Sequence, residues 1–472
     1  MHDHLTDLVA ALDAERIRAG AIRLLAEVGM AVPAAHVARR LEAAGLGLVA
    51  GRLRLDPEVV QGFMERQRQQ AAQMEPPEEP LRLSVGSHCL YEFDGGTQRI
   101  ERLTVARLER ATRLVGALQQ EGVLHGAYCP GAPADVPPHV APLWQQFVGA
   151  RFLPAPPIYA YSPAYVPYAA AMAAVLGKEL GAGVHPISPL ILGGDELDLA
   201  LHLLDQGSLG SVGVGPMPVM GVTAPLDWEA AWAQAVAEAV GTAVALRAMG
   251  VPQVTARAAL YVADLRNGAF VFGSPEHVLI TLTEAKVNRE LLGLGRRSAK
   301  AIDTTAKEPG AQAAIEKTAH TLAALLAGYR ALDCVASLAV DEVFSAQQLF
   351  IDLDIVAHCW RIVRGVEPRF CEGDPVALVR QGLAAQEFLT AEATVARFRD
   401  FYHSPQTFDR RATGAWLADP QPQLACAQAL AEERIRDYRY ELDADRQRAL
   451  RQIIARAEAE LTGGAAGAHA AG

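Results

Sequence analysis

Several short apolar stretches of this chain end in acidic side chains, at points where a predicted strand passes into a loop. Asp303 ends SAKAID, and Asp341 and Glu342 follow DCVASLAV. A buried, unpaired carboxylate is costly, so one that faces inward usually has a basic partner or a cationic ligand. Asp303 therefore either has a basic partner within the chain or acts on a cationic substrate. For Asp341 and Glu342 we favour a helix cap or an ion pair with an arginine.

Three basic or acidic side chains accompany Asp303. Lys307 and Glu308 follow it in the same predicted loop. Lys307 could bind a substrate carboxylate, or could serve proton transfer together with Asp303 or Glu308; a solvated lysine is the alternative. Arg257 stands in an otherwise apolar strand, where it either anchors an anion or pairs with an acid such as Asp303. We predict catalytic roles for Asp303, Lys307 and Glu308, and substrate binding by Arg257.

The stretch SVGVGPMPVMGVTAPLDW, residues 211–228, predicts a strand that breaks into a loop rich in glycine and proline. Such a loop presents backbone rather than long side chains, which is typical of a pocket floor. We predict that Ser188, Met217, Gly221 and Thr223 contribute to this floor and bind substrate. The alternatives are that the loop residues only shape turns and that Met217 fills the core.

Aromatic side chains lie at, or one step beyond, several predicted strand ends. An aromatic face attracts a cation by about 0.5–2 kcal/mol. Side chains alternate along a strand, so Tyr159 and Tyr161 would share one face. We predict that Tyr161 and Phe344 bind substrate, with packing in the core or rim as the alternative.

From about residue 123 the pattern repeats strand, loop and amphipathic helix. Seven such units are visible, and an eighth strand is expected near residues 367–371. No phosphate-binding glycine motif opens a helix, which favours a closed (βα)8 TIM barrel over an open nucleotide-binding sheet. The predicted α/β organisation is an N-terminal helical and β-hairpin extension (1–122), a TIM-barrel core (123–374), C-terminal helices packed on the barrel (375–462) and a disordered tail (463–472).

Composition restricts the function further. The formal net charge of -11 argues against nucleic acid as a partner. The 6 cysteines are scattered without a CxxC pair, so we predict no metal site and a reduced, cytoplasmic setting. An uninterrupted apolar run long enough for a membrane span is missing, as is the apolar segment of a signal peptide.

Five short motifs occur along the chain in an order and spacing that match a known family. They are Ile187–Leu190 (ISPL), Gly221–Pro225 (GVTAP), Ala237–Glu238, Gly273–Glu276 (GSPE), and Thr305–Lys307 followed by Gln312–Ala313 and Glu316. In order and spacing they resemble the trimethylamine methyltransferase (MttB-like) superfamily. Thr305 and Gly310 stand where the family motif has aspartates, and Ala393 stands where it has a histidine. We predict that these three positions decide which methyl donor fits, with Thr305 at the substrate.

The resemblance implies a corrinoid-dependent methyltransferase, with the corrinoid (cobalamin) cofactor supplied by a partner protein. The founding enzymes carry pyrrolysine near residues 301–304, whereas this chain has only standard residues there. It therefore resembles the non-pyrrolysine branch. A quaternary ammonium leaves as a neutral amine without a general acid, so a quaternary, betaine-like donor is expected. We also expect a homo-oligomer.

Two other functions remain open from the sequence. One is a self-contained barrel lyase or hydrolase, with Lys307 and Asp303 or Glu308 in proton transfer. The other is a non-catalytic barrel that binds a betaine-like ligand. Dependence of activity on a corrinoid distinguishes the three.

Overall fold

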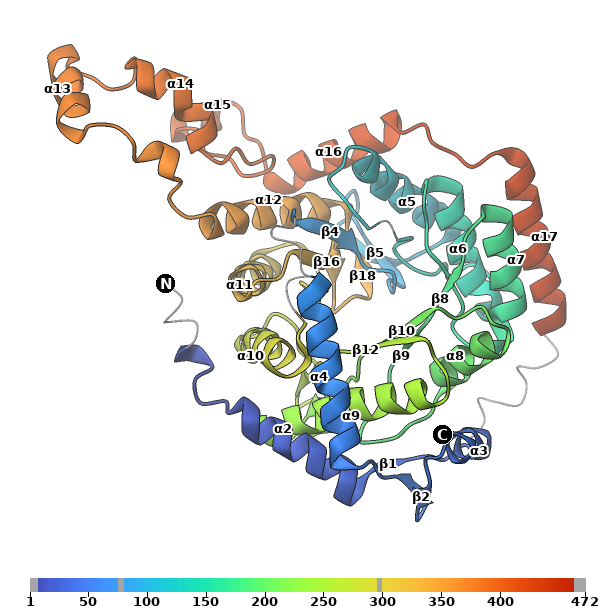
Figure 1. Ribbon diagram of the computed structural model, residues 1–472. Helices are drawn as coiled ribbons and strands as arrows, with labels where there is room; N and C mark the ends of the chain where they lie inside the picture. Colours follow the sequence, from blue (N-terminus) through green and yellow to red (C-terminus); the bar gives the residue numbers. More distant parts are fainter. Residues whose placement is uncertain (1–6, 75–79, 127, 295–298, 462–472) are drawn as a thin grey trace.

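The computed structural model describes residues 7–74, 80–126, 128–294 and 299–461. Short strands lie inside a ring of helices (Figure 1). The predicted disordered tail, residues 463–472, lies outside the described residues. Within the described part of the chain, no helix combines the length and apolarity that crossing a membrane requires.

The N-terminal part consists of helices and a hairpin, as predicted. Its elements are α2 (Ala14–Arg23), the π-helical turn η1 (Leu24–Val28), β1 (Met30–Ala31), α3 (Ala35–Ala43), β2 (Leu48–Val49), β3 (Arg52–Leu53) and α4 (Pro57–Met74). Asp13 caps α2 by accepting hydrogen bonds from the amides of Glu15 and Arg16. Between β2 and β3, Ala50 and Gly51 have φ of 51° and 73°, the left-handed pair that a tight hairpin turn requires.

Parallel strands form the centre of the molecule. They are β4 (Arg82–Val85), β7 (Ile158–Tyr159), β8 (Leu180–Gly181), β9 (Gly183–Val184), β10 (Ser211–Val214), β12 (Gln253–Ala256), β15 (Ala299–Ala301) and β16 (Ala331–Val335). Their ladders run β9–β10–β12, β15–β16–β4 and β7–β8. Among the described residues these ladders do not join into a closed ring. The mixed α/β arrangement is thus shown, while the closed barrel stays a prediction.

A ring of helices surrounds these strands (Figure 1). They are α5 (Val105–Gln120), α6 (Ala141–Phe152), α7 (Val166–Leu176), α8 (Asp195–Asp205), α9 (Trp228–Ala248), α10 (Pro275–Leu292), α11 (Ala311–Ala327) and α12 (Ala346–Val363). Their apolar faces bury two clusters, one that includes Trp232 of α9 and one that includes Phe147 of α6 and Phe350 of α12. The alternation of strand and helix follows the predicted pattern.

Two side-chain amides form hydrogen bonds with the backbone of β12 and of the residues just after it. Gln67 of α4 accepts from the Ala256 amide at 2.8 Å and donates to the Ala256 carbonyl at 2.9 Å. Asn288 of α10 does the same for Ala258, at 2.9 and 2.8 Å. These two amides act in place of a neighbouring strand, which satisfies the buried backbone. They provide a physical reason for the missing β12–β15 ladder.

Two details of the predicted strand order are wrong. Residues 367–371 form no strand; Pro368–Phe370 is a short 3-10 helix, and Pro368 has no amide hydrogen for a ladder. Among the described residues of 123–129, which exclude residue 127, the structure has an isolated bridge between Gly126 and Ser84 of β4 and no strand. The additional parallel strand is β4, which pairs with β16 although the predicted boundary at residues 122 and 123 separates them.

Short antiparallel hairpins extend beyond the carboxyl ends of the strands. β5 (Tyr91–Asp94) pairs with β6 (Arg99–Arg102), β17 (Ser337–Leu338) with β18 (Val343–Phe344), and β13 (Tyr261–Asp264) with β14 (Ala269–Phe270). Parallel pairs connect β18 to β5 and β11 (Val219–Met220) to β13. The loops that follow the central strands therefore carry their own secondary structure.

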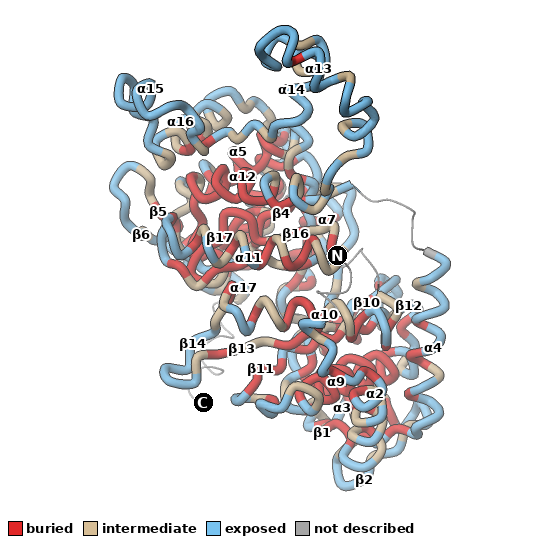
Figure 2. The backbone as a smooth tube through the Cα atoms, turned by 90° about the vertical axis from the view of Figure 1, so that its left-hand side faces the viewer, coloured by how far each residue is buried: buried red, intermediate tan, exposed pale blue. Residues whose placement is uncertain are grey.

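The C-terminal helices divide into two groups. Helix α16 (Gln423–Asp437) packs on α12 and α5, and α17 (Ala444–Leu461) packs on α6 and α7. By contrast, α13 (Pro375–Ala385), α14 (Glu392–Phe401) and α15 (Thr413–Ala418) extend to one side and are mostly exposed (Figures 1 and 2). We call residues 366–405 the arm. The prediction that all of residues 375–462 pack on the core is therefore corrected: α16 and α17 pack on the surrounding helices, whereas α13 and α14 are mostly exposed.

Candidate functional site

Asp303 lies two residues beyond β15 and is nearly inaccessible, at 4% exposure. Among the described residues, its Oδ1 has no hydrogen-bond partner. Burial raises the pKa of this carboxyl well above its usual range, Lys317 opposes that shift, and Asp341 adds to it. The Cys334 thiol hydrogen-bonds to the same carboxylate. One oxygen atom of this buried acid thus has no partner in the part of the chain that the structure describes.

A strained segment passes beside Asp303. We call residues 334–341, which begin with the last two residues of β16, the strap. Cys334, Ala336, Ala339 and Val340 have φ of 63°, 73°, 53° and 75°. Left-handed conformations cost non-glycine residues about 1–3 kcal/mol each, most for a β-branched side chain, and persist only where surrounding contacts impose them. Such strain is concentrated at functional sites in proteins.

Hydrogen bonds on both sides hold the strap. The Ala339 amide donates to the Ala306 carbonyl at 2.6 Å, and the Val340 amide donates to the Thr304 carbonyl at 2.7 Å. These bonds tie the strap to the loop that carries Asp303.

A buried ion pair fixes the first half of the strap. Lys317 of α11 and Asp352 of α12 are 2.7 Å apart, with both side chains at 0% exposure. Asp352 also accepts from the Ala336 amide at 2.8 Å, and Lys317 donates to the Cys334 carbonyl at 3.3 Å. The pair therefore connects two helices to the strap through buried, charge-assisted bonds.

Arg257 pairs with an acid, but not with Asp303. Its guanidinium contacts Glu284 of α10 at 2.5 Å, and Lys300 contacts the other Glu284 oxygen at 2.8 Å. Burial alone would raise the pKa of Glu284, but Lys300 and Arg257 lower it to about 2. Two cations thus share one carboxylate. The buried Arg257 Nε has no hydrogen-bond partner.

Tyr261 lies near both charged groups. Burial and the neighbouring Glu284 raise the pKa of this phenol to about 12, while Arg257 acts against the rise and Asp303 adds to it. Tyr261 therefore stays neutral near physiological pH. Its ring packs against Phe272 at 6.1 Å between centroids.

The structure does not bring the other two predicted catalytic residues to Asp303. Lys307 and Glu308 are exposed. The Lys307 ammonium donates to the Thr305 carbonyl at 2.9 Å, within its own loop. No hydrogen bond or ion pair joins either side chain to Asp303 within the described ranges.

The predicted floor residues have structural contacts. Ser188 donates to Glu238 of α9 at 2.6 Å. The Thr223 hydroxyl accepts from the Val219 amide at 2.9 Å, which closes the turn after β11. Gly221 has φ of 78°, and a Cβ there would lie 2.8 Å from Leu265.

Four further predicted residues have varied surroundings. Met217 is 47% exposed, whereas Phe344 is core at 1%. The Thr305 hydroxyl bridges the amide and carbonyl of Phe272, both at 3.0 Å. Tyr161 contacts the Tyr159 ring edge to face at 5.1 Å, as the shared face predicts. Its hydroxyl donates to Gln145 at 2.9 Å.

The sequence reasoning did not select Asp341, Cys334 or Cys89 for the site. The position of Asp341 after a predicted strand was the one signal in its favour. It does not cap α12, because Ser345 does so by accepting from the Gln348 amide at 3.1 Å. Nor does Asp341 form an ion pair with any residue that the structure describes.

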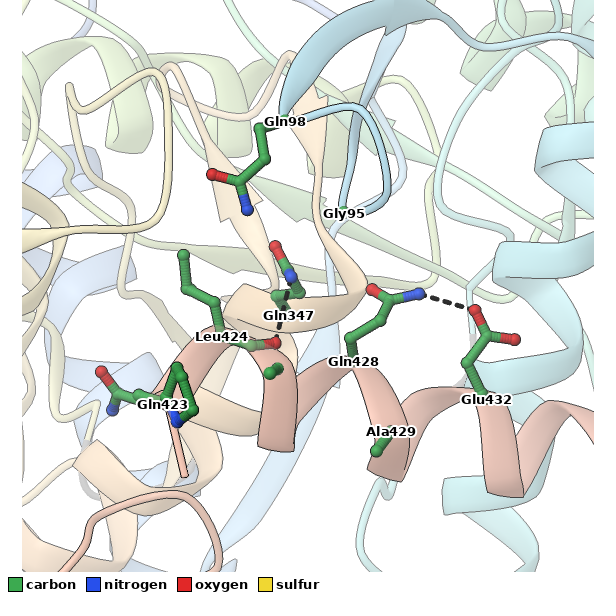
Figure 3. Close-up of a pocket in the computed structure, with 10 residues that line it drawn as sticks. Gly95, Gln98, Gln347, Gln423, Leu424, Gln428, Ala429 and Glu432 are labelled. Atoms are coloured by element: carbon green, nitrogen blue, oxygen red, sulfur yellow. Dashed lines mark hydrogen bonds between the residues drawn. The ribbon is translucent and has the colours of Figure 1, made fainter. Parts of the chain in front are cut away.

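A separate hollow of about 620 Å³ lies between α16, the start of α12 and the β5–β6 turn. It is lined by Gly95, Gln98, Gln347, Pro422, Gln423, Leu424, Ala425, Gln428, Ala429 and Glu432. Figure 3 shows Gln347 donating to the Leu424 carbonyl, at 3.1 Å, and Gln428 donating to Glu432, at 2.6 Å. This hollow contains none of the predicted site residues.

Comparison with known proteins points to one family. Residues 182–462 match the family described as trimethylamine methyltransferase (MTTB). A trimethylamine methyltransferase of Methanosarcina thermophila is 33% identical over 174 residues, which cover 37% of this chain and 35% of the relative. One of Methanosarcina barkeri strain Fusaro is 29% identical over 205 residues, covering 42% and 40%. The chain thus spans about a third to two fifths of the length of these curated relatives.

Proposed function

This chain belongs to the trimethylamine methyltransferase family, and from that premise we propose that it transfers a methyl group from a quaternary, betaine-like amine to the Co(I) centre of a corrinoid carried by a partner protein. The corrinoid is here the methyl acceptor. The closed (βα)8 barrel that would hold the site belongs to the same proposal. A homo-oligomer stays a prediction.

The unpartnered oxygen of Asp303 is the observation that carries this proposal. A buried carboxylate needs a cation or a proton, and no basic side chain among the described residues forms an ion pair with Asp303. Lys317, the nearby cation, is already bonded to Asp352. A quaternary ammonium has no N–H to donate, so it requires negative charge and apolar walls rather than hydrogen-bond acceptors. Asp303 supplies the negative charge, and a buried apolar cluster that includes Ala306 and Leu338 lies in its loop and the strap.

The reaction needs little from the protein beyond binding and orientation. The carbon–nitrogen bond breaks, its electron pair stays on nitrogen, and a carbon–cobalt bond forms with the electron pair of Co(I). No proton moves. The chain has to hold the donor in line with the incoming acceptor and to exclude water, which is a gain from proximity and orientation.

Arg257 contributes to the same proposal. Glu284 carries one charge for the two cations Arg257 and Lys300, so one positive charge remains. The buried, unpartnered Nε of Arg257 offers a donor for a substrate carboxylate. This supports a donor with both an ammonium and a carboxylate. The exposed position of Lys307 gives less support to proton-transfer chemistry with Asp303.

The test combines the full chain with free cob(I)alamin and a panel of methylated amines, with the methyl-Co(III) absorption spectrum as readout. At least one quaternary donor is expected to react, and trimethylamine is not. Asp303→Asn should lower kcat/KM by about 10–150-fold, the loss of one charge-assisted contact.

Asp264→Asn is the matched control, because that carboxylate is satisfied by Arg266 at 2.7 Å. It should react like wild type. Spectra without change for every donor, while the ligands still raise the melting temperature, would make the chain a binding protein rather than a methyltransferase.

A further inference from the structure

The strap brings a second carboxylate to Asp303. An isolated antiparallel bridge pairs Thr304 with Val340. In that register the residues before Thr304 and after Val340 lie opposite each other, so Asp303 faces Asp341. Directly opposed residues have Cβ atoms about 4.5–5.5 Å apart, and two like charges there are destabilising.

The charges around the two acids do not remove this repulsion. Asp341 forms no side-chain hydrogen bond or ion pair with the part of the chain that the structure describes. Lys317, the cation that acts on Asp303, is committed to Asp352. Asp333 adds further negative charge, although its Oδ1 accepts from Ser84 and from the Cys334 amide.

Two buried thiols, those of Cys334 and Cys89, are within electrostatic range of both acids. Cys334 and Cys89 are buried, at 8% and 1% exposure. Burial raises the pKa of Cys89 well above its usual range, and Asp341 and Asp303 both add to the shift, so this thiol lies near both carboxylates. Neutral sulfur is soft and polarisable and packs well against methyl groups.

We propose that Asp341 is a substrate-binding residue, and that Asp303 and Asp341 together form a paired-carboxylate seat for one small organic monocation. The identity of that cation as a methylated amine rests on the proposed function. Asp303 brings a buried, unpartnered oxygen, and Asp341 brings a charge without a partner. The strained residues before Asp341 are the backbone arrangement that aims it at this seat.

An organic cation suits the seat better than a metal ion. No group of three or more His, Cys, Asp or Glu side chains among the described residues is arranged to hold a metal. Two carboxylates with two buried thiols nearby match a monocation with an apolar surface, because the carboxylates balance its charge without requiring it to donate hydrogen bonds.

The seat also has a consequence for turnover. Loss of a methyl group converts the ammonium into a neutral amine, which keeps the electron pair of the broken bond. The product then has no charge for the two carboxylates, so its affinity falls. Because the seat stabilises the cationic ground state, its removal should raise KM more than it lowers kcat.

The experiment measures binding without any corrinoid, so its outcome is independent of methyl transfer. Choline and its neutral carbon isostere, 3,3-dimethylbutan-1-ol, are titrated into the full chain by calorimetry. Wild type should prefer choline, and Asp341→Asn should lose about 10-fold or more of that preference. Glu342→Gln, at the adjacent exposed residue, should leave the preference unchanged.

Asp341→Glu keeps the charge, so it should retain part of the preference and should show whether a loss in Asp341→Asn reflects misfolding. Equal choline preference in wild type and Asp341→Asn, or displacement of choline by millimolar MgCl2, would overturn the seat. Failure of the methyl-Co(III) assay with choline preference intact would overturn the proposed function alone.

Discussion

Glu238 and Asp303 are both buried acids close to the loops that follow the central strands, yet their surroundings are opposite. Glu238, at 0% exposure, accepts from Ser188, from the Leu190 amide and from Gln234, so both oxygens are satisfied. Asp303, at 4%, keeps one oxygen without a partner. Burial raises the pKa of both carboxyls, but three hydrogen bonds oppose the shift at Glu238.

The comparison separates two uses of a buried carboxylate. Glu238 fixes the loop at residues 188–190 and thereby serves the fold. Asp303 gains little from its own chain, and the strap beside it is held in strained conformations by bonds from other elements. Polar groups that are satisfied internally belong to the scaffold, and those left open indicate a ligand.

The largest effect on the free energy of unfolding is expected from loss of the Lys317–Asp352 pair, which holds the strap beside Asp303. Lys317→Met leaves Asp352 buried without a cation, so the free energy of unfolding should fall by about 3–5 kcal/mol. Urea unfolding measures it. Lys286→Met removes a partly exposed partner of Glu290, 2.8 Å away, and should cost about 0.3–0.5 kcal/mol. Equal losses in the two variants would show that the buried pair does not anchor the strap.

A direct contrast between the two acids comes next. Glu238→Ala breaks three hydrogen bonds and should lower the unfolding free energy by about 1–3 kcal/mol, while the folded fraction keeps its choline affinity. Asp303→Asn should leave the unfolding free energy unchanged or raise it, because it removes a buried carboxylate that lacks a full set of partners. It should also abolish the preference for choline. If Asp303→Asn destabilised as much as Glu238→Ala, the distinction between scaffold and site would be lost.

The pH dependence of choline affinity should show the raised pKa of Asp303. Choline favours the ionised carboxyl, so affinity should rise about tenfold per pH unit below that pKa and level off above it. The groups acting on Asp303 are Lys317, Asp341, Cys334 and Asp333.

The sign for stability is the reverse of the sign for affinity. Because the pKa of Asp303 is higher in the folded than in the unfolded state, this group stabilises the ligand-free protein at low pH. That contribution to the free energy of unfolding is lost as pH rises from about 3.9 towards the folded pKa. Calorimetric titration of Asp303→Asn is the control, and an unchanged slope would contradict the assignment.

The smallest effect is expected at Ala393, which the sequence comparison placed among the residues that choose the methyl donor. It lies on α14 in the arm, away from the strand ends (Figure 1). Ala393→His should change the donor preference less than about twofold, well within the effect of a surface substitution. A clear switch of donor in competition assays would mean that the arm reaches a substrate.

Periodicity and turn residues were enough to predict the helices, the β2–β3 hairpin and the strand–helix alternation, because these depend on neighbours in sequence. The role of β4 was missed because its partner β16 lies about 250 residues away and only the fold joins them. Asp303 was found from its position after a strand.

Asp341 required a different kind of information. Its place opposite Asp303 depends on an antiparallel bridge between two loops, and no local pattern encodes it. Likewise, pairing with an acid was one of two alternatives for Arg257, and the identity of that acid, Glu284 of the following helix, depends on packing.

The arm leaves and rejoins the molecule on one helix. It starts after the end of α12, and the amides of Gln406 and Thr407 return to Asp354 of the same helix at 2.9 and 2.7 Å. Val363 and Asp354 are separated by about 14 Å along the helix axis. In α13 and α14 only Gly382 is buried. Residues 366–405 are therefore an insertion that begins and ends beside the same helix. It can be lengthened, shortened or replaced by a short linker without changing the path of the helices that cover the strands.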